Sequence, residues 1–253
     1  MPEVVFLCSC ALIAGWVDAV GGGGGLIQIP ALFAVFPSTS PAVLLGTNKL
    51  SSFFGTAVAL LRYRSLHFVE PHRWITAVAA ALVGSGAGAF VATWVPANAM
   101  RISVLVLVGC VLAYMMFNRV ATTLTERPEN IPSRGTQAVL GGGAGMYDGL
   151  FGPGTGSFLI LFLVRWGGMD FVRASAAAKA INLATNSGAL GFFVFAHSLE
   201  YSVGLPMAVC NVLGAWIGSS MAGRFGPRLV RGVLFTVVAA LCFKLLVELF
   251  LGS

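Results

Sequence analysis

The chain has 253 residues, of which 57% are hydrophobic and only 9% are charged. So little charge cannot cover the surface of a water-soluble protein of this size, and the composition therefore predicts a protein embedded in the lipid bilayer, with no separate soluble domain. The net charge of +6 comes mostly from arginines between apolar segments, which indicates orientation in the membrane and excludes nucleic acid as the expected partner.

The first apolar segment, 4–20, has the character of a helix and is interrupted by five consecutive glycines at 21–25. Apolar sequence resumes at 26–36, which is only about half the length that a bilayer crossing requires. We therefore expect a broken helix or a re-entrant hairpin. Three full spans should follow, at 42–61, 74–95 and 101–117.

The pattern restarts after a polar link. This link, 119–135, is expected in the cytoplasm between a first repeat, 1–118, and a second repeat, 136–253. In the second repeat the apolar run 136–151 is broken at 152–156 and continues only as a short piece. Further spans are expected at 174–196, 203–222 and 232–251. The fold class is thus one all-α membrane domain of two repeats, each with a glycine-broken hairpin and three transmembrane helices.

The two repeats align without gaps when 130 is added to each position of the first. The matches that carry most weight are the charged ones: Asp18 with Asp148, Lys49 with Lys179, His67 with His197, Glu70 with Glu200 and Arg101 with Arg231. Residues of these types are scarce in this chain, so their coincidence indicates an internal duplication.

Equivalent loops differ in charge in opposite senses. The loop 62–73 holds three arginines, whereas its equivalent, 192–203, has no Lys or Arg. In the next loop the imbalance reverses, with Arg101 alone in the first repeat against Arg224, Arg228 and Arg231 in the second. Since basic loops favour the cytoplasmic side, equivalent loops should lie on opposite sides. The repeats are therefore predicted to be inverted, with both termini outside.

Two lysines, Lys49 and Lys179, lie within predicted spans, where an ammonium group costs about 2.5–3.5 kcal/mol. An anionic substrate or an internal carboxylate would offset that cost, and Asp18 and Asp148 share the repeat symmetry. Two interpretations stay open. In one, an Asp–Lys pair within each half only locks the hairpin to the next helix; in the other, the lysines bind an anion and the carboxylates carry a coupling proton.

Both glycine clusters should expose helix N-termini, whose backbone amides and positive dipole end can hold an anion inside the membrane. The residues expected to do so are Gly24, Gly25, Gly154, Thr155 and Gly156. The alternative is that these glycines only allow close packing.

Polar side chains near the two lysines are expected to line the same cavity, or else to bridge helices. These are Thr47, Asn48, Asn182 and Asn186, with Gln28 and Thr155 as weaker candidates. Asn211 has no repeat partner and is not assigned to the cavity. No cluster supplies enough His, Cys or carboxylate ligands for a metal, and no nucleophile–base arrangement indicates an enzyme. We expect no cofactor.

Three motifs resemble the TauE/SafE family of sulfite and organosulfonate transporters: the stretch 15–30 with its five glycines, Gly46-Thr-Asn-Lys-Leu50, and 147–158. The resemblance covers essentially the entire chain. It implies movement of sulfite, sulfonates such as sulfoacetate, or related anions across the inner membrane, mostly outward. The 147–158 motif resembles a branch whose members mostly lack defined substrates, and Ala177-Ala178-Lys179 replaces the Thr-Asn-Lys of the first repeat, so the two sites are not chemically identical.

The sequence thus predicts a multi-pass secondary transporter of the cell inner membrane that exports small anions, sulfite or organosulfonates first among them. An anion channel or facilitator and a non-transporting subunit of a membrane complex stay as alternatives. The coupling ion, a proton or sodium, and assembly as a homodimer also stay open.

Overall fold

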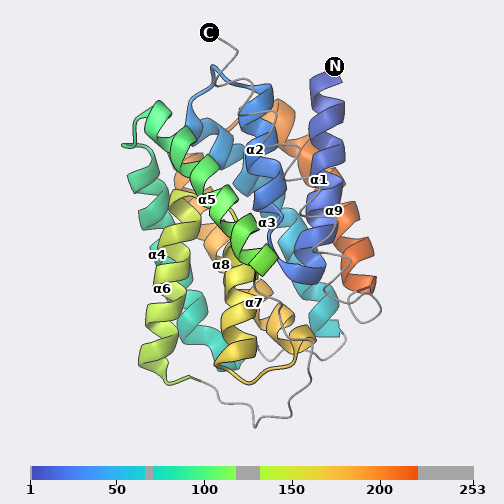
Figure 1. Cartoon of the computed structure of the whole chain (residues 1–253), viewed down its shortest axis with the longest axis vertical. Helices are drawn as coiled ribbons and strands as arrows, with labels where there is room; N and C mark the ends of the chain where they lie inside the picture. Colours follow the sequence, from blue (N-terminus) through green and yellow to red (C-terminus); the bar gives the residue numbers. More distant parts are fainter. Residues whose placement is uncertain (1, 66–70, 118–131, 222–253) are drawn as a thin grey trace.

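The computed structural model describes residues 2–65, 71–117 and 132–221, and in these ranges the regular structure is entirely helical (Figure 1). The helices are α1 (Pro2–Gly21), α2 (Gly25–Val35), α3 (Pro41–Ser65), α4 (Ile75–Ala92), α5 (Ala97–Phe117), α6 (Arg134–Leu150), α7 (Thr155–Arg165), α8 (Phe171–Phe195) and α9 (Tyr201–Met221), with a 3₁₀ turn at Pro71–Trp74. The predicted last span, 232–251, and the link, apart from its end, lie outside the described residues.

Within the described ranges, four helices are long and apolar enough to cross a membrane: α1, α3, α4 and α9. Helix α8 has the same length as α3, 25 residues or about 37 Å at 1.5 Å per residue. These lengths and compositions confirm the predicted all-α integral membrane protein.

Both predicted helix breaks are present, and glycines make them. Helix α1 ends at Gly21 and α2 begins at Gly25, with Gly22 and Gly23 at φ 71° and 99°. In the second half the break covers 151–154, with Gly152 at φ 90° and Gly154 at φ 84°. Residues with a side chain rarely adopt this left-handed backbone. The prediction that this break extends to 156 was wrong, because α7 already begins at Thr155.

Helix bounds repeat with the spacing found in the sequence. The bounds of α7 are those of α2 with 130 added, and the same holds for α8 and α3. Figure 1 shows that the equivalent helices run in opposite directions: α1 descends from the end where the N-terminus lies, whereas α6 ascends from the other end. Helices α2 and α7 each return toward the end of the bundle from which their hairpin entered, so the two ends of each hairpin lie on the same side of the bundle.

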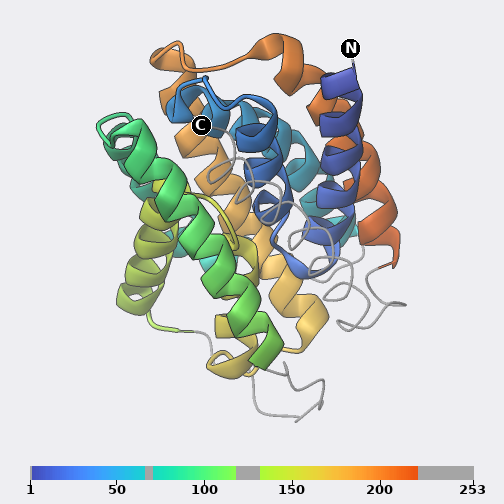
Figure 2. The same cartoon turned by 45° about the horizontal axis from the view of Figure 1, so that its top comes forward.

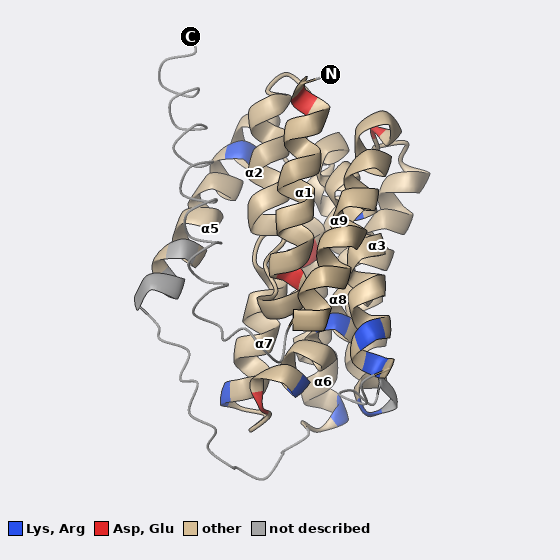
Figure 3. Cartoon of the chain, turned by 90° about the vertical axis from the view of Figure 1, so that its right-hand side faces the viewer, with Lys and Arg blue, Asp and Glu red and all other residues tan. Residues whose placement is uncertain are grey.

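Basic residues gather at one end of the molecule (Figure 3). Helix α3 ends with Arg62 and Arg64, α6 begins with Arg134, α7 ends with Arg165, and Arg173 lies in the first turn of α8. Arg101 lies near the start of α5 at the opposite end, where its guanidinium donates to the carbonyl oxygens of Pro37 and Thr39. This distribution agrees with the loop-charge pattern from which inversion was predicted.

Glycines bring helices of opposite halves into close contact. A Cβ atom on Gly84 of α4 would overlap the backbone of Gly142 in α6, and one on Gly214 of α9 would overlap that of Leu12 in α1. These two contacts are related by the 130-residue repeat, as are those of Gly88 and Gly218. The α1–α9 and α4–α6 pairs are therefore equivalent interfaces that only small residues permit.

Helix α5 runs obliquely along the side of the bundle (Figure 2). Its buried residues, Met100, Val104, Val108 and Val111, recur at helical spacing and pack into the core that surrounds α1 and α2. The first hairpin is thereby enclosed by protein on this side.

Candidate functional site

The two helix breaks meet inside the bundle. A Cβ atom on Gly22 would lie 2.5 Å from the carbonyl carbon of Gly156, and one on Gly25 would lie 3.2 Å from the carbonyl oxygen of Gly152. The hydroxyl of Ser157 donates to the carbonyl of Gly21 at 3.3 Å. Only glycine allows backbones to approach this closely. The close-packing interpretation of the glycines therefore holds at this crossing, and the helix N-termini lie beside it.

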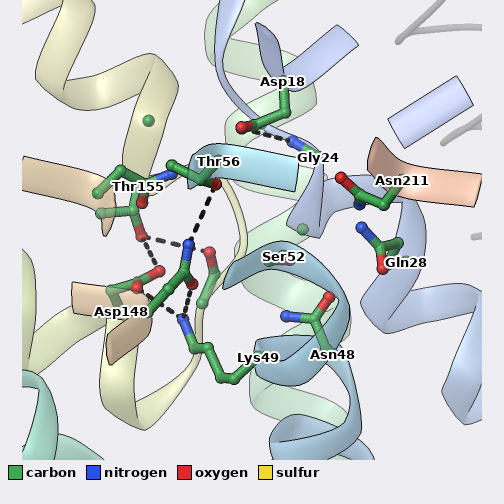
Figure 4. A pocket seen from close by; sticks show the side chains of 17 residues that line it. Asp18, Gly24, Gln28, Asn48, Lys49, Ser52, Thr56, Asp148, Thr155 and Asn211 are labelled. Atoms are coloured by element: carbon green, nitrogen blue, oxygen red, sulfur yellow. Dashed lines mark hydrogen bonds and ion pairs between the residues drawn. The ribbon is translucent and has the colours of Figure 1, made fainter. Parts of the chain in front are cut away.

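A small cavity lies at this crossing (Figure 4). Its volume, counted as space open to the centre of a water-sized molecule, is about 20 Å³. Its walls come from both hairpins and from α3, α8 and α9. The residues expected at the site that line it are Asp18, Gly24, Gly25, Gln28, Asn48, Lys49, Asp148, Gly154, Thr155, Gly156, Asn182 and Asn186. Lys179 and Thr47 are not part of its wall.

One side of the cavity holds a buried network around Lys49. Its ammonium lies 2.6 Å from Oδ2 of Asp148, and the side chains are only 2% and 3% exposed. The other oxygen of Asp148 accepts a hydrogen bond of 2.8 Å from the hydroxyl of Thr155. Lys49 also donates to Asn186 at 3.4 Å, and Asn186 donates to the hydroxyl of Thr56 at 3.3 Å. Both halves of the chain thus contribute to one polar cluster.

A second ion pair joins Lys179 to Asp18 at 2.7 Å. Lys179 is fully buried, while Asp18 is 15% exposed and lines the cavity, so the carboxylate separates this lysine from the open space. The other oxygen of Asp18 accepts a hydrogen bond of 3.3 Å from the backbone amide of Gly24. Asp18 therefore connects the start of its own α2 to the lysine of the other half.

Each lysine pairs with the carboxylate of the opposite half, so the interpretation of an Asp–Lys pair within each half was wrong. The physical reason is depth. Each lysine lies eight residues into its helix, about 12 Å from the end at which that helix starts, and α3 and α8 start at opposite ends. Helices α1 and α6 extend past the middle of the bundle, which brings Asp18 to Lys179 and Asp148 to Lys49.

Thr47 was expected beside Lys49 in the cavity, and the structure places it elsewhere. Its hydroxyl donates to the carbonyl of Val43 at 2.7 Å and accepts from the backbone amide of Glu200 at 3.0 Å. A position two residues before Lys49 is turned by about 200° around the helix axis. Thr47 therefore faces α9, and its hydrogen bond with the amide of Glu200 fixes the connection between α8 and α9.

Three further polar side chains that were not expected there line the cavity: Ser52, Thr56 and Asn211. Ser52 and Thr56 are the repeat equivalents of Asn182 and Asn186, so the 130-residue register could have identified both. Gln28 and Asn211 have no polar counterpart in the register. Their position depends on how α2 and α9 pack, which the sequence pattern does not specify.

Of the two helix N-termini at the breaks, that of α7 has more backbone amides without a hydrogen-bond acceptor in the described part of the chain than that of α2. Its first internal hydrogen bond joins the amide of Phe158 to the carbonyl of Gly154 at 3.1 Å, so the amides of Thr155, Gly156 and Ser157 have no acceptor within the helix. In α2 the amide of Gly24 is already taken by Asp18. The positive end of α7 is therefore the one better placed to hold an anion.

No three His, Cys, Asp or Glu side chains of the described ranges come close enough together to hold a metal ion. His67 and Glu70 lie outside those ranges, whereas His197 and Glu200 are surface residues at the end of α8 and the start of α9.

Comparison with known proteins agrees with the membrane architecture. The family model described as sulfite exporter TauE/SafE matches residues 7–245. The "Probable membrane transporter protein ORF9" of Sinorhizobium sp is 33% identical over 245 residues, covering 97% of this chain and 93% of the relative. "Probable membrane transporter protein YfcA" of Escherichia coli (strain K12) is 33% identical over 239 residues, covering 94% and 87%. A "Probable membrane transporter protein" of Haemophilus influenzae is 28% identical over 228 residues, covering 90% and 88%. No solved structure gives a significant match. The chain therefore belongs to the TauE/SafE family of membrane transporters.

Proposed function

We propose that the protein is a secondary transporter that exports small oxyanions, sulfite or organosulfonates such as sulfoacetate, through the cavity between its two hairpins. The observation that carries this proposal is the buried Lys49, which lies in the cavity wall beside the N-terminus of α7 and is paired with a carboxylate of the other half. The description of the matching family model, a sulfite exporter, supports this choice of substrate and direction.

An entering oxyanion would take the place of the Asp148 carboxylate at the ammonium of Lys49, and the free amides of α7 would bind its other oxygens. Asp148 would then be a buried carboxylate without its cation, which is a costly state. It would take up a proton, so that binding of the anion and binding of one proton are linked. For a monovalent anion the step is electroneutral, and net export follows the concentration gradient of the anion together with that of the proton.

The size of the cavity supports a transporter over an open channel. A space of about 20 Å³ has room for about one water molecule. The hairpins must therefore move apart before an oxyanion can enter. The backbones of Gly22 and Gly156 touch at this point, so separation of the two hairpins there would open the site.

Transport by the purified protein in proteoliposomes tests the proposal. The wild type should take up labelled sulfite or sulfoacetate in a saturable manner, and the same anion inside the vesicles should accelerate uptake. Lys49→Gln should reduce uptake at least about tenfold, because the variant keeps a polar side chain but loses the cation. Arg173→Gln is the matched control, since it removes an exposed arginine paired with Asp170 far from the cavity.

Three results would contradict the proposal: no movement of any tested anion, flux that does not saturate, or full activity in a correctly folded Lys49→Gln protein. Non-saturating flux would instead favour the channel alternative.

A further inference from the structure

The wall of the cavity away from Asp148 contains neutral amides that lack partners. Gln28 is fully buried, and neither its amide nitrogen nor its oxygen has a hydrogen-bond partner among the described residues. Asn48 is 2% exposed, and its side-chain oxygen likewise has none there. Asn211, also 2% exposed, lies beside Gln28 (Figure 4). We call Gln28, Asn48 and Asn211 the amide cluster.

The backbone leaves room for the amide cluster. A Cβ atom on Gly55 of α3 would overlap the side-chain oxygen of Asn211, and one on Gly15 of α1 would lie 2.9 Å from the same oxygen. Two glycines on different helices thus accommodate one polar side chain at the cavity wall. Replacing either glycine with alanine would displace it.

Buried amides without partners are unfavourable, since they lose hydrogen bonds to water and gain none in the protein. Natural proteins leave few such groups, and those that remain usually contact a water molecule or a ligand. Gln28 and Asn48 both line the cavity, so whatever satisfies them enters through it.

The two sides of the cavity differ in hydrogen-bonding chemistry. The ammonium of Lys49 and the amides of α7 can only donate, which suits the oxygens of an anion. In the cluster, Gln28 and Asn48 each also present an oxygen that needs a donor, and rotating either side chain by half a turn still leaves it an oxygen to satisfy. A fully ionised oxyanion has no donor to offer, so it cannot satisfy the amide cluster by itself.

We infer that the amide cluster is a second subsite, which binds a hydrogen-bond donor, a hydroxyl or amino group, carried by the same molecule as the oxyanion. This inference rests on the proposed function, because it assumes an anion at Lys49. It narrows the substrate class to small sulfonates that are hydroxylated or aminated, in preference to those with a purely apolar tail.

Two sulfonates of similar shape test the subsite: 2-hydroxyethanesulfonate, which ends in a hydroxyl, and 1-propanesulfonate, which ends in a methyl group. Their inhibition constants against uptake of labelled sulfite or sulfoacetate are measured in proteoliposomes. The wild type should bind the hydroxylated compound at least about tenfold more tightly, because the apolar compound leaves buried amides unpaired.

Gln28→Met and Asn48→Leu remove an amide at similar volume, and each should reduce that preference to about threefold or less. Gln137→Met is the control, because Gln137 is also buried but donates to the carbonyls of Arg73 and Pro132, away from the cavity. It should keep the wild-type preference. If one of the two cluster variants fails to fold, the other variant and the ratio of the two inhibition constants in the wild type still test the subsite.

Suppose that the wild type moves sulfite but binds the two sulfonates equally, prefers propanesulfonate or binds neither. Each of these results would contradict the second subsite and leave the proposed anion site at Lys49 standing. The second subsite is also wrong if both folded cluster variants retain the wild-type ratio. If the wild type moves no anion at all, the proposed function fails and the subsite fails with it.

Discussion

The ammonium of Lys49 and the carboxylate of Asp148 lie 2.6 Å apart although 99 positions separate them and they belong to opposite halves of the chain. Both groups are buried, so most of their mutual attraction is offset by the loss of hydration. The pair is therefore a poor source of stability when intact, but removal of one member leaves an uncompensated charge.

Lys49→Met should destabilise the protein by about 3–5 kcal/mol, because Asp148 is left without a cation. The double variant Lys49→Met/Asp148→Leu should recover most of that loss yet remain inactive, since the anion has no lysine to bind. Thermal unfolding in detergent and uptake into proteoliposomes measure the two effects separately. Transport by the double variant would show that the pair only holds the halves together.

Gly22→Ala should abolish transport and lower stability, because Gly22 has φ 71° and its new Cβ would lie 2.5 Å from the backbone of Gly156. Gly143→Ala is the matched control. This glycine lies inside α6 with no atom near its would-be Cβ, so the substitution should be neutral or stabilise by up to about 1 kcal/mol. Thermal unfolding and uptake rates of both variants would reveal the difference, and equal behaviour would contradict the contact between the breaks.

Two threonines of α3 should respond differently to replacement by valine. Thr56 lines the cavity and accepts a hydrogen bond from Asn186, so Thr56→Val should weaken the apparent affinity for the anion several-fold. Thr47 contacts Glu200 outside the cavity, so Thr47→Val should cost about 1 kcal/mol of stability and leave the affinity unchanged. A change of affinity in the Thr47 variant alone would place the site elsewhere.

Single cysteines at two exposed serines test the inverted topology. Ser133 caps the first helix of the second hairpin, and Ser202 lies in the first turn of α9, at the opposite end of the bundle. In a variant without native cysteines, a membrane-impermeant thiol reagent added to intact cells should label Ser202→Cys and spare Ser133→Cys. Labelling of both from the same side would remove the inverted repeat.

The helices and their breaks could be predicted because local composition determines them. The sequence shows runs of apolar residues and five glycines at 21–25. It also shows charged residues of the first half that recur 130 positions later in the second half. The register even relates Ser52 to Asn182 and Thr56 to Asn186, which line the cavity together.

The partners of Lys49 and Lys179 could not be deduced from proximity in sequence. They follow from how deeply α1 and α6 reach past the middle of the bundle, a length that depends on where each hairpin turns. Thr47 was misplaced because a residue two positions before Lys49 lies on the opposite side of the helix. Gln28 of α2 and Asn211 of α9 lie side by side (Figure 4) because both helices pack against α1 and α3, which no local pattern records.

Because Lys49 pairs with Asp148 and Lys179 pairs with Asp18, each half of the chain neutralises the buried lysine of the other. A half taken alone would keep one of these lysines and one of these aspartates, each without the partner that neutralises it in the whole chain. Two identical copies inserted in opposite orientations would cancel both charges, because each copy supplies the aspartate that the lysine of the other requires. In this chain, covalent linkage holds the two halves in the arrangement that pairs each lysine with the aspartate of the opposite half. Two separate, identical half-length chains would make the same ion pairs if they assembled antiparallel, and such a half-length chain would be viable only as that dimer.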